Sequence, residues 1–322
     1  MLYFANKSLG IFVILCYVNE SIRKGDCLMS ITVQHLSKSY RGKVNVLHNM
    51  NLVIPQGMYG LLGRNGAGKT TFMRILSTLL APSSGTVEIS SIPLNKRNIP
   101  QIKALIGYLP QEFNFYPNLR IDEALDYMGI LYMMDEKKRT RRIEEVLMEV
   151  NLFHERSKKV KQLSGGMRRR LGIAQAILHE PQVLIVDEPT AGVDPLERIS
   201  IRNLLSDYSK NHTVLLSSHI VEDIAATCQQ IAVLNNGQVA YNGGLKELIK
   251  RGKGAVWSCT LQNVQELDEM KRNHTVISSQ YFENSIEVRI LSKQKPNTSS
   301  VALEPSIEDA YMLLLEEGSD RK

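Results

Sequence analysis

The residues best suited to chemistry lie at 63–70, where the sequence reads GRNGAGKT. This stretch fits the pattern G-x-x-x-x-G-K-[ST]. It follows the apolar run Gly57–Leu62 and precedes Thr71–Leu80, whose apolar spacing predicts a helix. Glycines in such a loop let backbone amides point at phosphate oxygens, and the helix adds the positive end of its dipole. Lys69 would reach the β- and γ-phosphates of a nucleotide, and Thr70 would coordinate Mg²⁺. The stretch therefore predicts a nucleotide site; the alternative is a glycine-rich turn that binds nothing.

Two acidic residues, Asp187 and Glu188, follow the continuous apolar run Val183–Val186, which is typical of a buried parallel strand. Ligands of parallel sheets bind at the carboxyl ends of the strands, so this pair and the glycine-rich loop can converge on one ligand. Asp187 would hold Mg²⁺ through water, and Glu188 would take a proton from the attacking water. The alternative is an acidic turn at a strand end.

Apolar periodicity predicts the elements that must position these residues. Residues 163–181 predict an amphipathic helix that Pro181 ends, and Asn235-Asn236-Gly237 indicates a hairpin. The other predicted helices are Ile121–Met134 and Thr140–Val150, and the other predicted strands are Ile31–Leu36, Val46–Ile54, Thr86–Ser90, Ile106–Leu109, Thr213–Ser217, Ile231–Leu234 and Gln238–Tyr241.

Past Gly244 the character of the sequence changes. A short helix is predicted at Lys246–Lys250, and Lys250–Gly254 has the composition of a linker. The remainder predicts a small α+β region with little core of its own. Its predicted strands are 255–261, 274–282 and 285–291, and its predicted helices are 264–272 and 306–316.

The composition is that of a globular protein with a proper core: of 322 residues, 43% are hydrophobic and 22% charged, with a net charge of +6. Two basic clusters, Lys137–Arg142 and Arg168–Arg170, are typical of solvated helix faces; an anionic membrane surface or a partner protein is the alternative, with nucleic acid last. The four cysteines show no metal-ligand spacing and favour a reducing, cytoplasmic setting. They are Cys16, Cys27, Cys228 and Cys259.

Residues 1–28 differ from the rest of the chain. Their apolar run, Leu9–Val18, is shorter than the roughly 20 residues that span a bilayer. A signal peptide is conceivable, but no small-residue cleavage site follows. A third hypothesis is that translation starts at Met29, because Lys24–Asp26 can be encoded by a purine-rich ribosome-binding sequence. A native tryptic peptide from upstream of Met29 would contradict it.

Residues 30–244 resemble the nucleotide-binding domain of ATP-binding-cassette (ABC) proteins, because six motifs occur in the order of that family. They are Walker A at 63–70, a Q-loop at Gln111, the signature LSGGM at 163–167, Walker B at 183–189, a D-loop at 191–195 and an H-loop at His219. The resemblance implies an α/β P-loop NTPase core with a mixed sheet, an antiparallel β subdomain and a helical signature subdomain. Residues 245–322 would add a small α+β accessory extension.

The resemblance also implies roles for single residues. Tyr40 would stack on the adenine, although its alternative is ordinary packing; Gln111 would sense Mg²⁺ and the water, and His219 would contact the γ-phosphate. Catalysis is expected from Glu188, His219 and Gln111, and Mg²⁺ binding from Thr70, Gln111 and Asp187. The expected ATP-binding set is Tyr40, Gly63, Arg64, Asn65, Gly66, Ala67, Gly68, Lys69, Thr70, Thr71, Ser164, Gly165, Gly166 and Asp194.

One departure from the family is Met167, where Gln is usual. Ser164, Gly165 and Gly166 remain, so the departure concerns a detail of binding. In ABC proteins the signature of one subunit completes the Walker A site of another, and Asp194 would act across that interface. Two copies, or one copy and a homologous subunit, would therefore enclose two ATP molecules.

The function implied is that of the ATPase subunit of an exporter with a separate permease, resembling bacterial ABC-2-type systems and lying on the inner face of the cell membrane. The aromatic stretch Phe113–Tyr116 is a candidate docking surface, with loop packing as its alternative. The second hypothesis is a soluble ABC ATPase acting on ribosomes or nucleic acid. Such proteins carry paired cassettes, coiled-coil arms or zinc modules, which this sequence does not contain. A regulatory ATP-binding protein with little turnover is the third, and the presence of Glu188 argues against it.

Overall fold

The computed structural model describes residues 30–40 and 44–319, so the predicted leader and the proposed start at Met29 lie outside the described residues. The chain divides into two compact units. The first comprises residues up to 228 together with 232–239, and the second comprises 229–231 and the residues from 240 onward.

A six-stranded mixed sheet has the strand order β10-β9-β3-β8-β7-β6, and its strands β3, β8, β7 and β6 lie wholly in the first unit. Its neighbouring pairs β3–β8, β8–β7 and β7–β6 are parallel. The carboxyl ends of these four strands therefore lie at one edge, and each leads into a predicted motif. The strands are β3 (Gly57–Leu62), β6 (Ile106–Leu109), β7 (Val183–Asp187), β8 (Thr213–Ser218), β9 (Gln230–Asn235) and β10 (Gln238–Gly244).

An antiparallel sheet with the order β2-β1-β4-β5 shares one hydrophobic core with the central sheet. Ile31 and Leu52 from this sheet, Phe72 from α1 (Lys69–Leu76) and Ile185 from β7 all belong to that core. The strands are β1 (Ile31–Tyr40), β2 (Val44–Ile54), β4 (Ser84–Ile89) and β5 (Ile92–Pro93). The shared core fixes the helix that follows the glycine-rich loop against both sheets.

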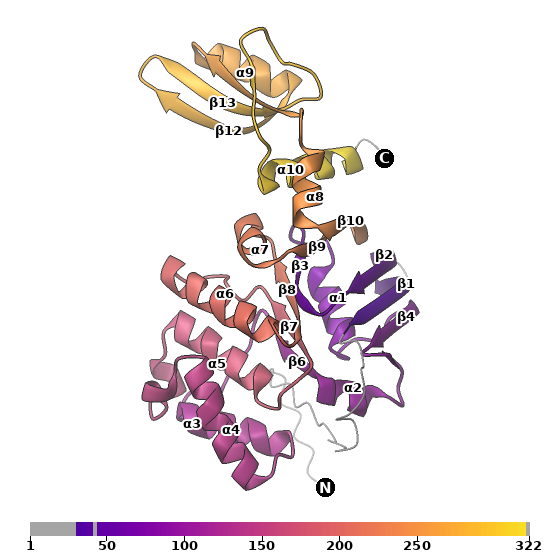
Figure 1. The fold of residues 1–322 in the computed structure, drawn as a ribbon, viewed down its shortest axis with the longest axis vertical. Helices are drawn as coiled ribbons and strands as arrows, with labels where there is room; N and C mark the ends of the chain where they lie inside the picture. Colours follow the sequence, from indigo (N-terminus) through magenta and orange to yellow (C-terminus); the bar gives the residue numbers. More distant parts are fainter. Residues whose placement is uncertain (1–29, 41–43, 320–322) are drawn as a thin grey trace. The chain divides into compact units, whose positions relative to one another are not determined.

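Three helices, α3 (Ile121–Leu131), α4 (Glu136–Glu149) and α5 (Gly165–Ile177), contact one another and form a helical group apart from the antiparallel sheet (Figure 1). The sequence did not predict α2 (Ile99–Leu105), α6 (Pro195–Ser209) or α7 (Val221–Thr227). Short 3₁₀ turns occupy Phe153–Glu155 and Val160–Gln162. Among the described residues no helix has both the length and the apolarity to cross a bilayer.

The second unit contains an antiparallel sheet with the order β12-β13-β11-β14. Two apolar clusters hold it together: Leu267 of α9 belongs to one, and Leu313 of α10 belongs to the other. Arg289 and Asp309 add an ion pair of 2.6 Å. The elements are α8 (Leu245–Arg251), β11 (Val256–Leu261), α9 (Val264–Asn273), β12 (Thr275–Phe282), β13 (Ser285–Leu291), β14 (Val301–Ala302) and α10 (Ile307–Ser319).

One of the two basic clusters is less solvated than the sequence predicts, whereas Lys137, Lys138 and Arg141 of the other are exposed as expected. Arg168 is exposed, but Arg169 and Arg170 are buried, so the expectation of a solvated face at Arg168–Arg170 is wrong for two of its three residues. Arg170 is buried because it donates to the carbonyl oxygen of Asn151 at 2.9 Å and to Oε1 of Glu197 at 3.0 Å. A buried guanidinium is stable only where such acceptors replace water.

Candidate functional site

The glycine-rich loop leaves backbone amides available at the start of α1. Gly68 precedes the helix with φ +105°, and no side chain caps the first turn, which also contains no acidic residue. A Cβ at Gly68 would lie 2.7 Å from Cδ2 of Leu47, so both the conformation and the close packing require glycine. An uncapped helix start of this kind attracts phosphate oxygens.

Lys69, the first residue of α1, is buried beneath this loop. Its Nζ donates to the carbonyl oxygen of Gly63 at 2.6 Å and lies 3.6 Å from Oε1 of Glu188. Burial lowers the pKa of Lys69, while the negative charges of Glu188 and Asp187 oppose that shift. The structure thus pairs the predicted phosphate-binding cation with the predicted base.

Glu188 brings the predicted catalytic residues together. Its Oε1 lies 3.0 Å from Nδ1 of His219, and its Oε2 accepts a hydrogen bond from Nε2 of Gln111 at 3.3 Å. The residue is buried, and its backbone has φ +48°, in the left-handed region that costs a residue with a Cβ roughly 1–2 kcal/mol. Backbone strain at a residue that could act as a base is typical of functional sites.

Ser217 belongs to this cluster although the sequence analysis did not single it out. It is the register partner of Asp187 across β7 and β8. Its hydroxyl donates to Oδ1 of Asp187 at 2.5 Å and accepts from the backbone amide of Glu188 at 3.1 Å. Its position two residues before His219, at the end of an apolar strand, is the sequence signal that could have identified it.

The expected magnesium ligands line one cavity of about 250 Å³ that contains Thr70, Gln111 and Asp187. Within the described residues, Oδ2 of the buried Asp187 has no hydrogen-bond partner. An unpaired buried carboxylate oxygen on a residue that shares a cavity with a hydroxyl and an amide side chain suits a hydrated Mg²⁺, which prefers oxygen ligands. The residues present therefore fit the ion.

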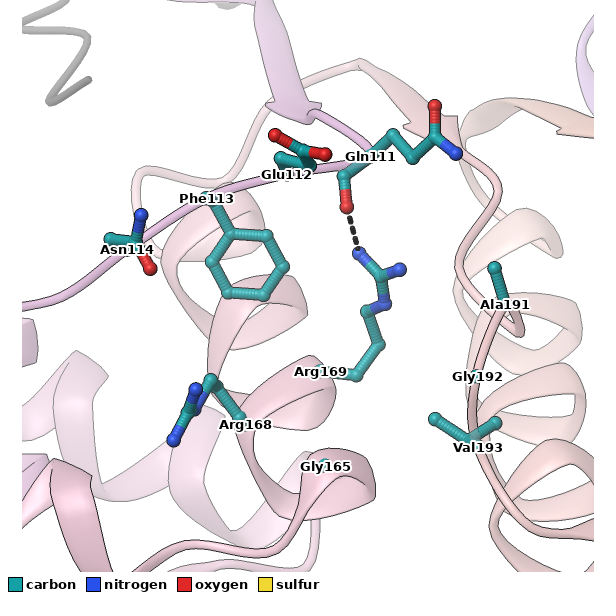
Figure 2. A pocket seen from close by; sticks show the side chains of 10 residues that line it. All are labelled: Gln111, Glu112, Phe113, Asn114, Gly165, Arg168, Arg169, Ala191, Gly192 and Val193. Atoms are coloured by element: carbon teal, nitrogen blue, oxygen red, sulfur yellow. Dashed lines mark hydrogen bonds between the residues drawn. The ribbon is translucent and has the colours of Figure 1, made fainter.

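A second residue absent from the predicted set is Arg169 on α5. Its guanidinium donates to the carbonyl oxygen of Gln111 at 2.9 Å, as Figure 2 shows. It also donates to the carbonyl oxygen of Glu188 at 3.2 Å. Burial lowers the pKa of Arg169, and the charges of Asp187 and Glu188 oppose the shift. Sequence reasoning missed it because a run of three arginines is typical of a solvated face.

The signature and D-loop residues lie at two exposed helix starts. Ser164 caps α5 by accepting from the amide of Met167 at 3.1 Å, and Asp194 caps α6 by accepting from the amide of Glu197 at 2.9 Å. Position 167 thus contributes its backbone to the cap. Across the described part of the chain, no hydrogen bond or ion pair joins Ser164–Gly166 to the glycine-rich loop.

The aromatic candidates divide into exposed and packed residues. Tyr40 ends β1 with 40% of its surface exposed, and the Lys38 ammonium lies 5.5 Å from its ring. Tyr116 is also exposed, whereas Phe113 is half-buried and packs edge to face on Phe115 with ring centroids 5.8 Å apart. Within the candidate docking surface, Phe113 therefore has a packing role.

The remaining loop residues are distributed around the same turn. Ala67 is buried and its carbonyl oxygen accepts from the amide of Gly237 at 3.1 Å, while Thr71 is half-buried. Arg64, Asn65 and Gly66 are exposed on the loop.

Comparison with known proteins agrees with this geometry. The family model described as ABC transporter matches residues 47–191. The bacitracin transport ATP-binding protein BcrA of Enterococcus faecalis is 38% identical over 226 residues, covering 69% of this chain and 72% of the relative. The Nod factor export ATP-binding protein I of Cupriavidus metallidurans is 36% identical over 221 residues, covering 68% and 72%.

Among solved structures, this chain resembles a dimeric post-hydrolysis state of the ATP-binding cassette MJ0796 bound to ADP and Pi. The match has a TM-score of 0.60 and 28% identity, covering 66% of this chain and 98% of the cassette. The predicted α/β P-loop NTPase fold is thereby confirmed. Together with the identity and coverage of the relatives, these findings show that the chain belongs to the family of ABC transporter ATP-binding proteins.

Proposed function

We propose that this chain binds and hydrolyses MgATP as one of two ATPase subunits that drive a separate membrane permease in the direction of export. The observation that carries the proposal is the arrangement at Glu188, whose carboxylate is bordered by Lys69, Gln111 and His219. Beside it, Asp187 has an unpaired Oδ2 and lines one cavity together with Thr70. These are the groups that phosphoryl transfer to water requires.

The chemistry follows from these contacts. The phosphates of ATP would accept hydrogen bonds from the backbone amides at the start of α1. They would also compete with Glu188 for the ammonium of Lys69. Glu188, released from that ion pair, would take a proton from the attacking water while His219 contacts the γ-phosphate. Mg²⁺, held by Thr70 and Gln111 and by Asp187 through water, would neutralise phosphate charge.

The other proposed contacts to ATP complete the site. Tyr40 would stack on the adenine, and the loop residues 63–71 would surround the phosphates. Ser164, Gly165, Gly166 and Asp194 would act on the ATP bound by a second subunit. The exposure of Ser164, Gly165 and Asp194 supports this proposal. We assign this work to residues 29–244 and an accessory role to 245–322.

The membrane partner is proposed from the relatives. One is named for bacitracin transport and another for Nod factor export. The ATPase subunit would lie on the inner face of the cell membrane and contact the permease through exposed residues near Tyr116.

Glu188→Gln tests the hydrolytic assignment, because the amide keeps the shape of the side chain but cannot take a proton. We expect ATP binding to persist, ATP-dependent dimers to accumulate in size-exclusion chromatography, and turnover to fall by about 10²–10⁴-fold. Glu144→Gln, which removes an exposed carboxylate of α4, is the matched control. Wild-type turnover in the Glu188 variant would remove this residue as the base.

A pull-down of the full chain from detergent-solubilised native membranes tests the transport assignment. Recovery of a polytopic membrane protein that changes ATP turnover is the expected result. Recovery of ribosomes or nucleic acid instead would contradict the proposal and favour the soluble ABC ATPase hypothesis.

A further inference from the structure

Arg169 joins three parts of the site that are distant in the sequence. It lies on α5, which begins at the signature, and its acceptors belong to residues 58 and 19 positions away. Both acceptors are backbone carbonyl oxygens, of Gln111 and of Glu188. A forked guanidinium can serve two such acceptors at once in a fixed geometry.

The contact with Glu188 holds a strained residue. Glu188 has φ +48°, and its backbone is held on both sides: Ser217 accepts from its amide, and Arg169 donates to its carbonyl oxygen. The direction of the Glu188 carboxylate toward Lys69 and His219 depends on that backbone conformation. Loss of the bond to Ser217 would leave the buried Glu188 amide unpaired, and loss of the bond from Arg169 would leave the carbonyl oxygen with the amide of Ala191, 3.3 Å away, as its remaining donor. Either loss would make the strained conformation less favourable.

The contact with Gln111 is reinforced by packing. The guanidinium carbon of Arg169 lies 5.5 Å from the centroid of the Phe113 ring. On the same helix, a Cβ at Gly172 would lie 2.5 Å from Cζ of Phe113, so the absence of a side chain there admits the ring. Figure 2 shows Arg169 extending from α5 to the segment that carries Gln111 and Phe113. This segment is thus fixed to α5 at two points.

We propose that Arg169 is a positioning residue, which makes the orientation of Glu188 and Gln111 depend on the position of the signature helix α5. The inference rests on the proposed function, because it concerns the residues assigned to hydrolysis there. Arg169 has no need to touch ATP: a shift of α5, or of the segment that follows Gln111, would move the backbone of Glu188 and change the rate of water activation.

Arg169→Lys is the decisive variant because it keeps the charge and replaces the fork by a single ammonium. We expect kcat for ATP hydrolysis by the full chain to fall by roughly tenfold to a hundredfold, since small misplacements of catalytic groups have effects of that size. The Kd for ATP, measured in the absence of hydrolysis, and the melting temperature should change little. Arg168→Lys, on the exposed neighbour in the same helix, is the matched control and should keep wild-type kcat.

A double-mutant comparison separates positioning from simple stabilisation. If Arg169 acts through Glu188, Arg169→Lys should cause almost no further loss of single-turnover hydrolysis when Glu188 is already Gln. Arg169→Gln, which keeps two amide donors on a shorter side chain, provides a second series if the lysine variant is poorly folded.

Wild-type kcat in Arg169→Lys, or a loss that multiplies with that of Glu188→Gln, would overturn the inference. A wild-type chain that does not hydrolyse ATP, alone or with native membranes, would instead contradict the proposed function, so the two failures are distinguishable.

Discussion

At the scale of single residues, burial gives several polar side chains properties that they lack in water. Lys69 and Glu188 are both buried and lie within 3.6 Å of each other, so each offsets part of the other's loss of hydration. Phosphate oxygens can replace Glu188 as the partner of Lys69. The same pair can therefore stabilise the chain without nucleotide and release the carboxylate when nucleotide binds.

His179 is a buried residue outside the candidate site. Its ring stacks on Tyr132 with centroids 4.2 Å apart, and its Nε2 lies 3.1 Å from the carbonyl oxygen of Ile106, to which it donates. In the described structure its Nδ1 has no hydrogen-bond partner. Burial lowers the pKa of His179 to about 4, because no acceptor replaces water at the second ring nitrogen.

We predict that His179 makes the chain less stable at mildly acidic pH. The unfolded chain takes up the proton near pH 6.5 and the folded chain only near pH 4, so between these values the unfolded state binds more protons and acid favours unfolding. The contribution to the free energy of unfolding should fall by about 2 kcal/mol between pH 7 and pH 5. Urea denaturation at both pH values measures this.

The control for this prediction is His179→Gln, whose amide can still donate to Ile106 but does not titrate. Its free energy of unfolding should depend less on pH by the same amount. An unchanged pH dependence in this variant would show that other groups cause the acid sensitivity.

At the scale of elements, α5 packs closely against the segment after Gln111. The Phe113 ring occupies the space at Gly172. We predict that Gly172→Ala lowers stability and ATP turnover. Alanine should raise helix propensity by about 1 kcal/mol, so any net loss must come from displacing the ring.

Phe113→Leu supplies the compensating change for that variant. Combined with Gly172→Ala it should restore part of the lost turnover, because the smaller side chain leaves space for the new methyl group. Chemical denaturation and steady-state ATPase of the two single variants and the double variant measure the coupling. Strictly additive losses would place the cause outside this contact.

The comparison of predicted and observed elements shows what local pattern can determine. Ile106–Leu109 and Ser285–Leu291 have the predicted bounds because their apolar patterns mark the strands clearly. α6 is not predicted, although Asp194 and Pro195 form a good helix start. The helix predicted from Thr71 begins at Lys69 and ends at Leu76, before a residue with positive φ at Thr78.

The residues of the candidate site fall into two groups: those that a sequence motif identifies and those that only the fold brings into the site. Residues that make contacts through recognisable motifs, such as Lys69, Glu188 and His219, are brought together as expected. Arg169 and Ser217 were not predicted, because their roles depend on partners that only the folded sheet and helix bring near. The spacing of residues in the sequence does not indicate that Arg169 contacts a carbonyl oxygen 58 positions away.

At the scale of the whole molecule, the exposed signature and the Walker A loop of one chain are not joined to each other in the described residues. Ser164 and Asp194 lie at exposed helix starts, and among the described residues no hydrogen bond or ion pair ties the signature to the loop that holds Lys69. If both are needed for hydrolysis, each active site must be completed by a second subunit. Activity would then be a property of a pair of chains.

We predict that two inactive variants restore activity when mixed. Lys69→Met removes phosphate binding, and Ser164→Arg places a large cation at the signature; each variant alone should form pairs in which both sites are defective. In a mixed pair, the intact loop of the Ser164 variant faces the intact signature of the Lys69 variant, so one complete site forms. Steady-state ATPase measured across mixing ratios should therefore be greatest near equal amounts, with each variant alone close to background.

The shape of this mixing curve distinguishes the possible assemblies. Mixing Lys69→Met with Glu188→Gln is the control, because both changes damage the same half of the site and neither mixed site is complete. Restoration in that control, or its absence for the Ser164 combination when exchange of labelled subunits is demonstrated, would contradict a site shared between chains. A maximum seen only for the Ser164 combination would place the signature of one chain at the nucleotide of the other.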